Sequence, residues 1–122
     1  CAKYGLELVS MIAPTSHERI RSIAAEAKGF VYCVSSLGVT GVRSSITTDI
    51  GAMVKLVKET KNIPAAVGFG ISTPEQAREM AQKADGVIVG SAIVKLIAEH
   101  GRDSVPVVYD YVKRMKDAIR DC

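Results

Sequence analysis

The chain has 122 residues, of which 48% are hydrophobic, 24% charged and 5% aromatic, and its formal net charge is +3. This length accommodates one domain with a modest core, and no apolar run is long enough to cross a membrane. Cations are scattered and tryptophan is absent, which argues against nucleic-acid binding, since that needs clustered charge and stacking side chains.

The three cysteines, Cys1, Cys33 and Cys122, have neither the spacing of metal ligands nor the number that a disulfide framework needs. We therefore predict no metal site, and a reducing cytoplasm as the location. Cys33 lies in an apolar stretch, where we expect it to be a small core residue.

The first part of the sequence alternates strand and helix patterns. After a short helical segment at residues 2–4, residues 6–14 predict a strand, and Thr15 or Ser16 is expected to cap the next helix. Gly29 is expected to end this helix, and residues 30–35 predict the second strand. The core face of the helix is predicted from apolar residues at helical spacing: Ile20, Ile23, Ala24 and Ala27.

Residues 36–45 follow the second predicted strand and are too numerous for a simple connection. Their glycines and hydroxyls, among them Gly38, Thr40 and Gly41, predict a mobile lid at the carboxyl end of a barrel strand. A helix is expected to start at Thr48 or Asp49. Its predicted inward face consists of Ile50, Met53, Val54 and Val57.

The stretch from Pro64 to Glu75 contains more residues suited to binding a ligand than any other twelve residues of the sequence. Residues 64–67 predict a buried strand, and Gly68 and Gly70 allow the backbone to turn sharply and to approach a ligand. Thr73 is the expected helix cap, with Pro74 at the first helical position and Gln76 closing a capping box. The N–H groups at such a helix start favour an anion.

A second strand of this kind, within residues 84–90, ends in glycine and leads into a helix predicted over residues 92–99. Ser91, at the helix start, can meet an anion with both its hydroxyl and its N–H group. The last helix starts at Ser104 and presents one apolar stripe, formed by Val108, Val112, Met115 and Ile119. Two successive strands with glycine at their carboxyl ends match the phosphate site after strands seven and eight of (β/α)8 barrels.

The sequence thus predicts an α/β fold of four βα units with a parallel sheet and the helices outside. Residues 1–122 would form a single half-barrel unit, equivalent to the last four βα units of a TIM barrel. An open four-stranded sandwich is the alternative arrangement.

The segments IAPTS, GFVYCVSSLGVTG, AAVGFGISTPEQA and ADGVIVGSAIVK occur in this order. Together they resemble the carboxyl-terminal half of the tryptophan synthase alpha chain, from about residue 6 to residue 96. The resemblance implies a lyase that splits indole-3-glycerol phosphate into indole and glyceraldehyde 3-phosphate, and that passes indole to a beta chain carrying pyridoxal phosphate. No cofactor is then expected in this chain.

The resemblance also implies roles for individual residues. The substrate phosphate would be held by Gly41, Gly70, Gly90 and Ser91. The indole pocket would be walled by Ile12, Tyr32 and Phe69. Thr40 matches a lid threonine that helps to hold a catalytic Asp in place, and Ser36 stands where some members have an Arg.

The family's acid-base pair, a Glu and an Asp, lies in the amino-terminal half, which has no counterpart in this chain. We therefore assign no catalytic residue here, expect structural roles for Glu7, Asp49, Glu75 and Asp85, and expect the chain to be inactive alone. One alternative is a non-catalytic half-barrel that binds phosphate and forms a homo-oligomer to cover its sheet edges. Another is a different phosphate-binding barrel enzyme of histidine or tryptophan biosynthesis.

Overall fold

The computed structural model describes residues 1–34, 46–68 and 70–122, apart from the side chains of residues 46–49. Its centre is a parallel sheet with strand order β1-β2-β3-β4, as the sequence predicts. The strands are β1 (Ser10–Ile12), β2 (Val31–Val34), β3 (Ala65–Gly68) and β4 (Gly86–Ile88). The helices are α1 (His17–Glu26), α2 (Ile46–Thr60), α3 (Pro74–Ala81), α4 (Ser91–His100) and α5 (Ser104–Ile119), with 3-10 turns at Ala2–Tyr4 and Gly101–Asp103.

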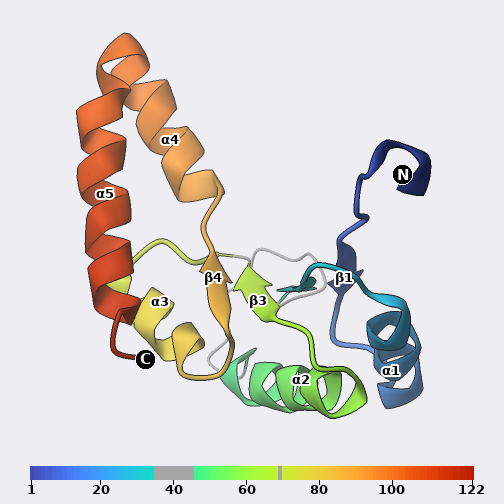
Figure 1. The fold of residues 1–122 in the computed structure, drawn as a ribbon. Coiled ribbons are helices and arrows are strands. Elements are labelled where there is room, and N and C mark those ends of the chain that lie inside the picture. The colour runs from blue at the N-terminus through green and yellow to red at the C-terminus, as the bar shows by residue number, and fades with distance from the viewer. Residues whose placement is uncertain (35–45, 69) are drawn as a thin grey trace.

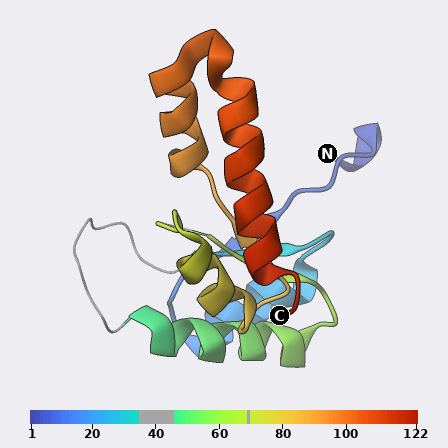
Figure 2. The ribbon, with the colours of Figure 1, turned by 90° about the vertical axis from the view of Figure 1, so that its left-hand side faces the viewer.

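The helices are distributed unevenly around the sheet. Helices α1 and α2 lie side by side beneath one face, and α3 lies next to β4 (Figure 1). Helices α4 and α5 form an antiparallel pair that rises away from the sheet, beyond the carboxyl end of β4 (Figures 1 and 2). The sheet is therefore covered by α1 and α2 on one side only.

Strand register decides which residues enter the core. Ile12 pairs with Cys33 and Cys33 with Val67, and all three are fully buried. The neighbouring row on the opposite face starts at Met11, which pairs with Tyr32 and is 61% exposed. Because side chains alternate along a strand, the first row faces α1 and α2 and the second faces away. The core beneath the sheet includes the predicted residues Ile20, Ala24, Ala27, Ile50, Met53, Val54 and Val57.

Burial determines the protonation state of Cys33, the only cysteine that lies inside the described core. Cys33 is fully buried, and burial raises the pKa of its thiol to about 11. This confirms the prediction of a core residue, since the neutral thiol behaves as a small apolar group. Cys1 and Cys122 are exposed.

Several element ends differ from those predicted. β1 is shorter than residues 6–14 because β2 starts at Val31, the partner of Ser10, and Leu6 and Leu8 remain 63% and 74% exposed. Helix α1 ends at Glu26 instead of Gly29, and the Lys61 ammonium binds the carbonyl of Ala27 at 2.6 Å. Helix α2 starts at Ile46, ahead of Thr48, and β4 ends before Gly90.

Asp85 connects three elements at the amino-terminal edge of the sheet. Its carboxylate accepts hydrogen bonds from the Lys58 ammonium at 2.7 Å and from the Ala65 N–H at 2.9 Å. The bond from Lys58, followed by that from Ala65, lowers the pKa of Asp85. The Asp85 N–H in turn donates to the Ala65 carbonyl at 2.9 Å. Asp85 therefore has the structural role expected for it, fixing the starts of β3 and β4 to α2.

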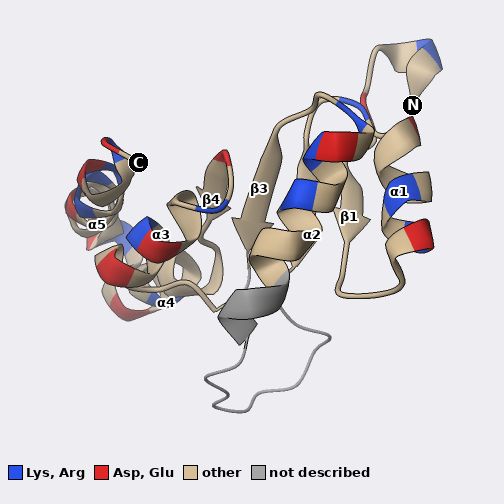
Figure 3. Cartoon of the chain, turned by 90° about the horizontal axis from the view of Figure 1, so that it is seen from below, with Lys and Arg blue, Asp and Glu red and all other residues tan. Residues whose placement is uncertain are grey.

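Among the described residues, the charged side chains lie outside the four strands, most of them on helices (Figure 3). Within the described part of the chain, no helix is both long and apolar enough to cross a bilayer.

Candidate functional site

A pocket of about 300 Å³ lies where β3 and β4 end and α4 begins. Its described lining residues are Tyr32, Gly70, Ile71, Ser72, Ile88, Gly90, Ser91, Ala92 and Lys95. Three of the four residues predicted to hold phosphate are among them, together with Tyr32 from the predicted indole pocket. The fold thus brings together residues from two separate βα turns.

Several contacts define the backbone between Gly70 and the start of α3. Gly70 has a φ of +70°, a left-handed conformation that costs a residue with a Cβ more than it costs glycine. Thr73 caps α3 in the predicted capping box, with its hydroxyl accepting from the Gln76 N–H at 3.2 Å. The Gln76 side-chain oxygen accepts from the N–H of Ser72 at 2.9 Å. The Tyr111 hydroxyl donates to the Ser72 carbonyl at 2.7 Å, so the turn is held from both sides.

The start of α4 presents backbone N–H groups to the pocket. Gly90 is the cap residue and supplies no capping side chain. The N–H groups of Ile93 and Val94 donate to the Gly90 carbonyl, whereas the N–H groups ahead of them lie where a helix offers no backbone acceptor. The helix dipole adds partial positive charge at this end. A Cβ built on Gly90 would meet no atom within 4 Å, so the backbone here is open to a ligand. Ser91 adds an exposed hydroxyl at the first helical position.

Gly68 has a different role from the one that the sequence suggests. It is buried in β3 and is not among the residues lining the pocket. A Cβ on Gly68 would lie 2.8 Å from Cζ of Tyr32, closer than real contacts allow. Its missing side chain therefore makes room for the Tyr32 ring over the sheet, and only Gly70 of the two glycines shapes the ligand turn.

The structure does not bring Ile12 together with Tyr32. Ile12 is fully buried on the face covered by α1 and α2, and its partner in β2 is Cys33. The strand alternation places Met11, the partner of Tyr32, on the face of the pocket instead. Four other predicted residues, Phe69 and the lid residues Gly38, Thr40 and Gly41, lie outside the described residues.

Lys95 lines the pocket, although the sequence motifs predict no role for it. The signal that could have found it is its spacing, because Ser91 and Lys95 are four residues apart on one helix. Residues at this separation lie on the same helix face, so a basic residue one turn after the predicted anion site is a candidate for the same ligand.

The described lining of this pocket contains no Asp, Glu, His or Cys. In the described part of the chain, no group of three or more such residues is placed to hold a metal ion. The N–H groups, hydroxyls and lysine of the pocket are of the kinds that bind anions, but the described lining residues include no carboxylate to move a proton at neutral pH.

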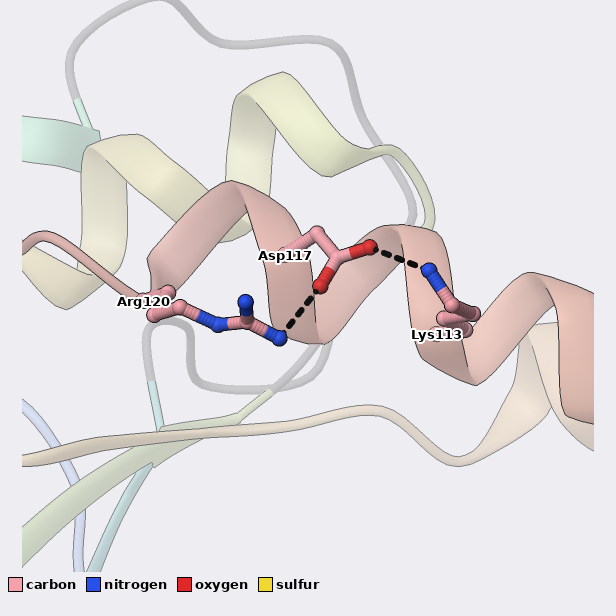
Figure 4. A network of polar contacts seen from close by, with 3 residues as sticks. All are labelled: Lys113, Asp117 and Arg120. Atoms are coloured by element: carbon pink, nitrogen blue, oxygen red, sulfur yellow. Dashed lines mark hydrogen bonds and ion pairs between the residues drawn. The ribbon is translucent and has the colours of Figure 1, made fainter.

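A larger groove of about 640 Å³ lies along α4 and α5 and is mostly apolar, with walls formed by Ile97, Val105, Val108, Tyr109 and Val112. At its rim the Asp117 carboxylate accepts from Lys113 at 2.9 Å and from Arg120 at 2.8 Å (Figure 4). The hydrogen bond from Lys113 is the main cause that lowers the pKa of Asp117. Asp117, the single acid among the described lining residues of this groove, is therefore held ionised in an exposed ion pair, which suits a surface contact better than catalysis. Met115 and Ile119, farther along the predicted stripe, pack in the cluster that joins α3 and α5.

The sequence matches the family model described as tryptophan synthase alpha chain over residues 1–120. The chain belongs to the tryptophan synthase alpha chain family. The tryptophan synthase alpha chain of Lactiplantibacillus plantarum is 53% identical over 117 residues, which cover 95% of this chain and 44% of that protein. That of Thermoanaerobacter sp. is 47% identical over 119 residues, covering 96% of this chain and 45% of that one.

Solved structures agree with this assignment. The tryptophan synthase alpha subunit of Campylobacter jejuni superposes with a TM-score of 0.80 at 32% identity, covering 94% of this chain and 46% of its own. A structure of the Pyrococcus furiosus tryptophan synthase α2β2 complex matches with a TM-score of 0.77 at 34% identity, covering 95% of this chain and 48% of the matched one. These relatives are TIM barrels, and this chain corresponds to part of that barrel. It spans less than half the length of the relatives it matches.

The close packing of Gly68 against Tyr32 predicts that adding a methyl group at residue 68 destabilises the fold, whereas adding one at another strand glycine does not. We expect Gly68→Ala to lower the free energy of unfolding by about 1–3 kcal/mol, because the added Cβ overlaps the Tyr32 ring and forces it to move. Denaturant unfolding followed by circular dichroism measures this.

Gly86→Ala is the matched control, since Gly86 lies in β4 and its added Cβ would be 3.6 Å from that of Ala66, an ordinary contact. We expect this variant to be at least as stable as the original protein. Equal destabilisation by both substitutions would contradict the role assigned to Gly68.

Proposed function

We propose that this chain supplies the phosphate-binding part of a tryptophan synthase alpha site. The observation that carries the proposal is the convergence of the Gly70 turn and the start of α4 on one pocket. Gly70, Gly90 and Ser91 would hold the phosphate of indole-3-glycerol phosphate through N–H groups and the Ser91 hydroxyl. Gly41 and the lid residues Gly38 and Thr40 are proposed on the family resemblance alone.

The proposed reaction is the cleavage of indole-3-glycerol phosphate to indole and glyceraldehyde 3-phosphate, a step of tryptophan biosynthesis in the cytoplasm. Tyr32, which lines the pocket, and Phe69 would contact the indole ring. Indole would pass to a beta chain that carries pyridoxal phosphate, whereas this chain would need no cofactor. The α2β2 complex of the Pyrococcus furiosus relative supports a beta-chain partner.

Within this scheme the described residues bind and orient the substrate. Binding the phosphate of the substrate would hold its glycerol carbon atoms in place relative to the protein. This reduces the entropy cost of reaching the transition state. Protonation of indole C3 and removal of the hydroxyl proton require positioned carboxylates, and none lines the described pocket. We therefore propose that residues 1–122 act as one half-barrel unit that binds the phosphate without completing the reaction.

Phosphate binding tests the site directly. Titration of the chain with glycerol 3-phosphate, followed by amide NMR, is expected to shift the signals of Gly70, Gly90 and Ser91 first. Gly90→Leu is expected to weaken binding about tenfold or more, equivalent to about 1.4 kcal/mol, because its side chain would occupy open space at the pocket.

Gly51→Leu is the control for this titration, since Gly51 lies in α2 and its Cβ would also meet no atom within 4 Å. It is expected to bind glycerol 3-phosphate as the original protein does. If the original chain shows no shifts at Gly70, Gly90 and Ser91, the proposed site is wrong.

An indole-release assay tests the proposal that the chain binds the phosphate without cleaving the substrate. The purified chain, given indole-3-glycerol phosphate, is expected to release no indole above background because the pocket residues include no acid-base carboxylate. Turnover that copurifies with the chain and disappears in Gly90→Leu would refute the proposed lack of activity and confirm the substrate.

A second proposal, self-association, is supported by the exposed apolar surface. β1 and β4 are the two edge strands, and edge strands offer backbone groups to another chain. The exposed large apolar residues near β1 are Leu6, Leu8, Val9 and Met11. Burying about 400 Å² of such surface would contribute on the order of 10 kcal/mol before the costs of association.

We accordingly expect a homodimer or higher oligomer, which sedimentation velocity at micromolar concentration would detect. Met11→Lys is expected to shift the protein toward the monomer, because it introduces a charge on the uncovered face. A well-folded monomer at all concentrations would rule out self-association. This result would not bear on the proposed phosphate site.

A further inference from the structure

Lys95 stands out among the residues around the proposed phosphate pocket. It is the lining residue, among those described, that carries a formal charge at neutral pH. The other described lining residues offer backbone N–H dipoles, the hydroxyls of Tyr32, Ser72 and Ser91, and apolar surface. A phosphate monoester carries up to two negative charges at neutral pH, which dipoles alone neutralise only partly.

The present partner of Lys95 does not hold it firmly. Its ammonium lies 3.9 Å from the Glu99 carboxylate, and the two side chains are 77% and 51% exposed. Such pairs along an exposed helix contribute little and are screened by salt. The flexible lysine side chain can therefore exchange this contact for an anion on the same helix face.

The chain provides an almost identical pair away from the pocket. Lys55 lies 3.9 Å from Glu59 with the same helical spacing, and these side chains are 77% and 57% exposed. Lys55 belongs to α2 and does not line the pocket. Its ion pair matches that of Lys95 in spacing and distance, and the two lysine side chains are equally exposed, whereas only Lys95 of the two lines the pocket.

We propose that Lys95 is a ligand-binding residue of this pocket, and that its ammonium pairs with the phosphate dianion held by Gly70, Gly90 and Ser91. This inference rests on the proposed phosphate site and adds to it the residue that selects a doubly charged ligand. Glu99 competes for Lys95 in the empty site and releases it when phosphate binds.

The test compares two substitutions in the full chain, with inorganic phosphate as the probe and amide NMR shifts as the measure of binding. Lys95→Met is expected to raise the Kd for phosphate about three- to fivefold, the range for an exposed charge pair. Lys55→Met is expected to leave the Kd unchanged, and Lys95→Arg to retain most of the affinity. Raising the salt concentration is expected to weaken phosphate binding by the original chain more than by Lys95→Met. Salt screens the attraction between the Lys95 ammonium and phosphate, and the variant lacks this attraction.

Three results would overturn the inference, and they differ. If the original chain binds phosphate at Gly70, Gly90 and Ser91 but Lys95→Met binds equally well, Lys95 has no role and the proposed site stands. If the original chain binds no phosphate there, both the site and the role of Lys95 fail. Equal losses in Lys95→Met and Lys55→Met would show a general effect of net charge and would also overturn it.

Discussion

Parallel strand pairing is the constraint on which the rest of this structure depends. The pairing of Cys33 with Val67 and of Val34 with Gly68 sets one row of side chains against α1 and α2, and leaves the next row on the uncovered face. Parallel order also places the carboxyl ends of all the strands at one edge of the sheet. The turn after β3 and the start of α4 therefore meet, although the chain between them forms α3 and β4. The pocket is a consequence of this topology.

The pocket depends on restraints that lie outside it. Tyr111 of α5 and Gln76 of α3 hold Ser72 through its carbonyl and N–H groups, so the Gly70 turn is set by two helices. Gly68 allows the Tyr32 ring to lie close over β3. At the opposite edge of the sheet, Asp85 fixes the starts of β3 and β4. A site built from backbone donors needs such support, because N–H groups stabilise an anion well only when they are already oriented.

Much of this arrangement could be predicted from the sequence. The strand, glycine turn and capping box around Thr73 are local features with strong residue preferences. The ordered glycine turns indicate the fold class, and the four ordered segments, with GVTG in one of them, indicate the family. Non-local features were harder to predict. The burial of Ile12 depends on strand register. The space above Gly68 is filled by the Tyr32 ring of another strand. The length of β1 is limited by where β2 begins. Lys95 is not predicted, because a charged residue on a helix looks like an ordinary surface residue until the position of the pocket is known.

A phosphate group bound between the Gly70 turn and the start of α4 would be visible in a crystal structure of the chain with glycerol 3-phosphate. We expect the phosphate oxygens to lie within hydrogen-bond distance, about 3 Å, of the Ser91 N–H and hydroxyl and next to Gly70. Phosphate bound instead in the groove of α4 and α5, beside Lys116 or Arg120, with the pocket at Gly90 empty, would contradict this expectation.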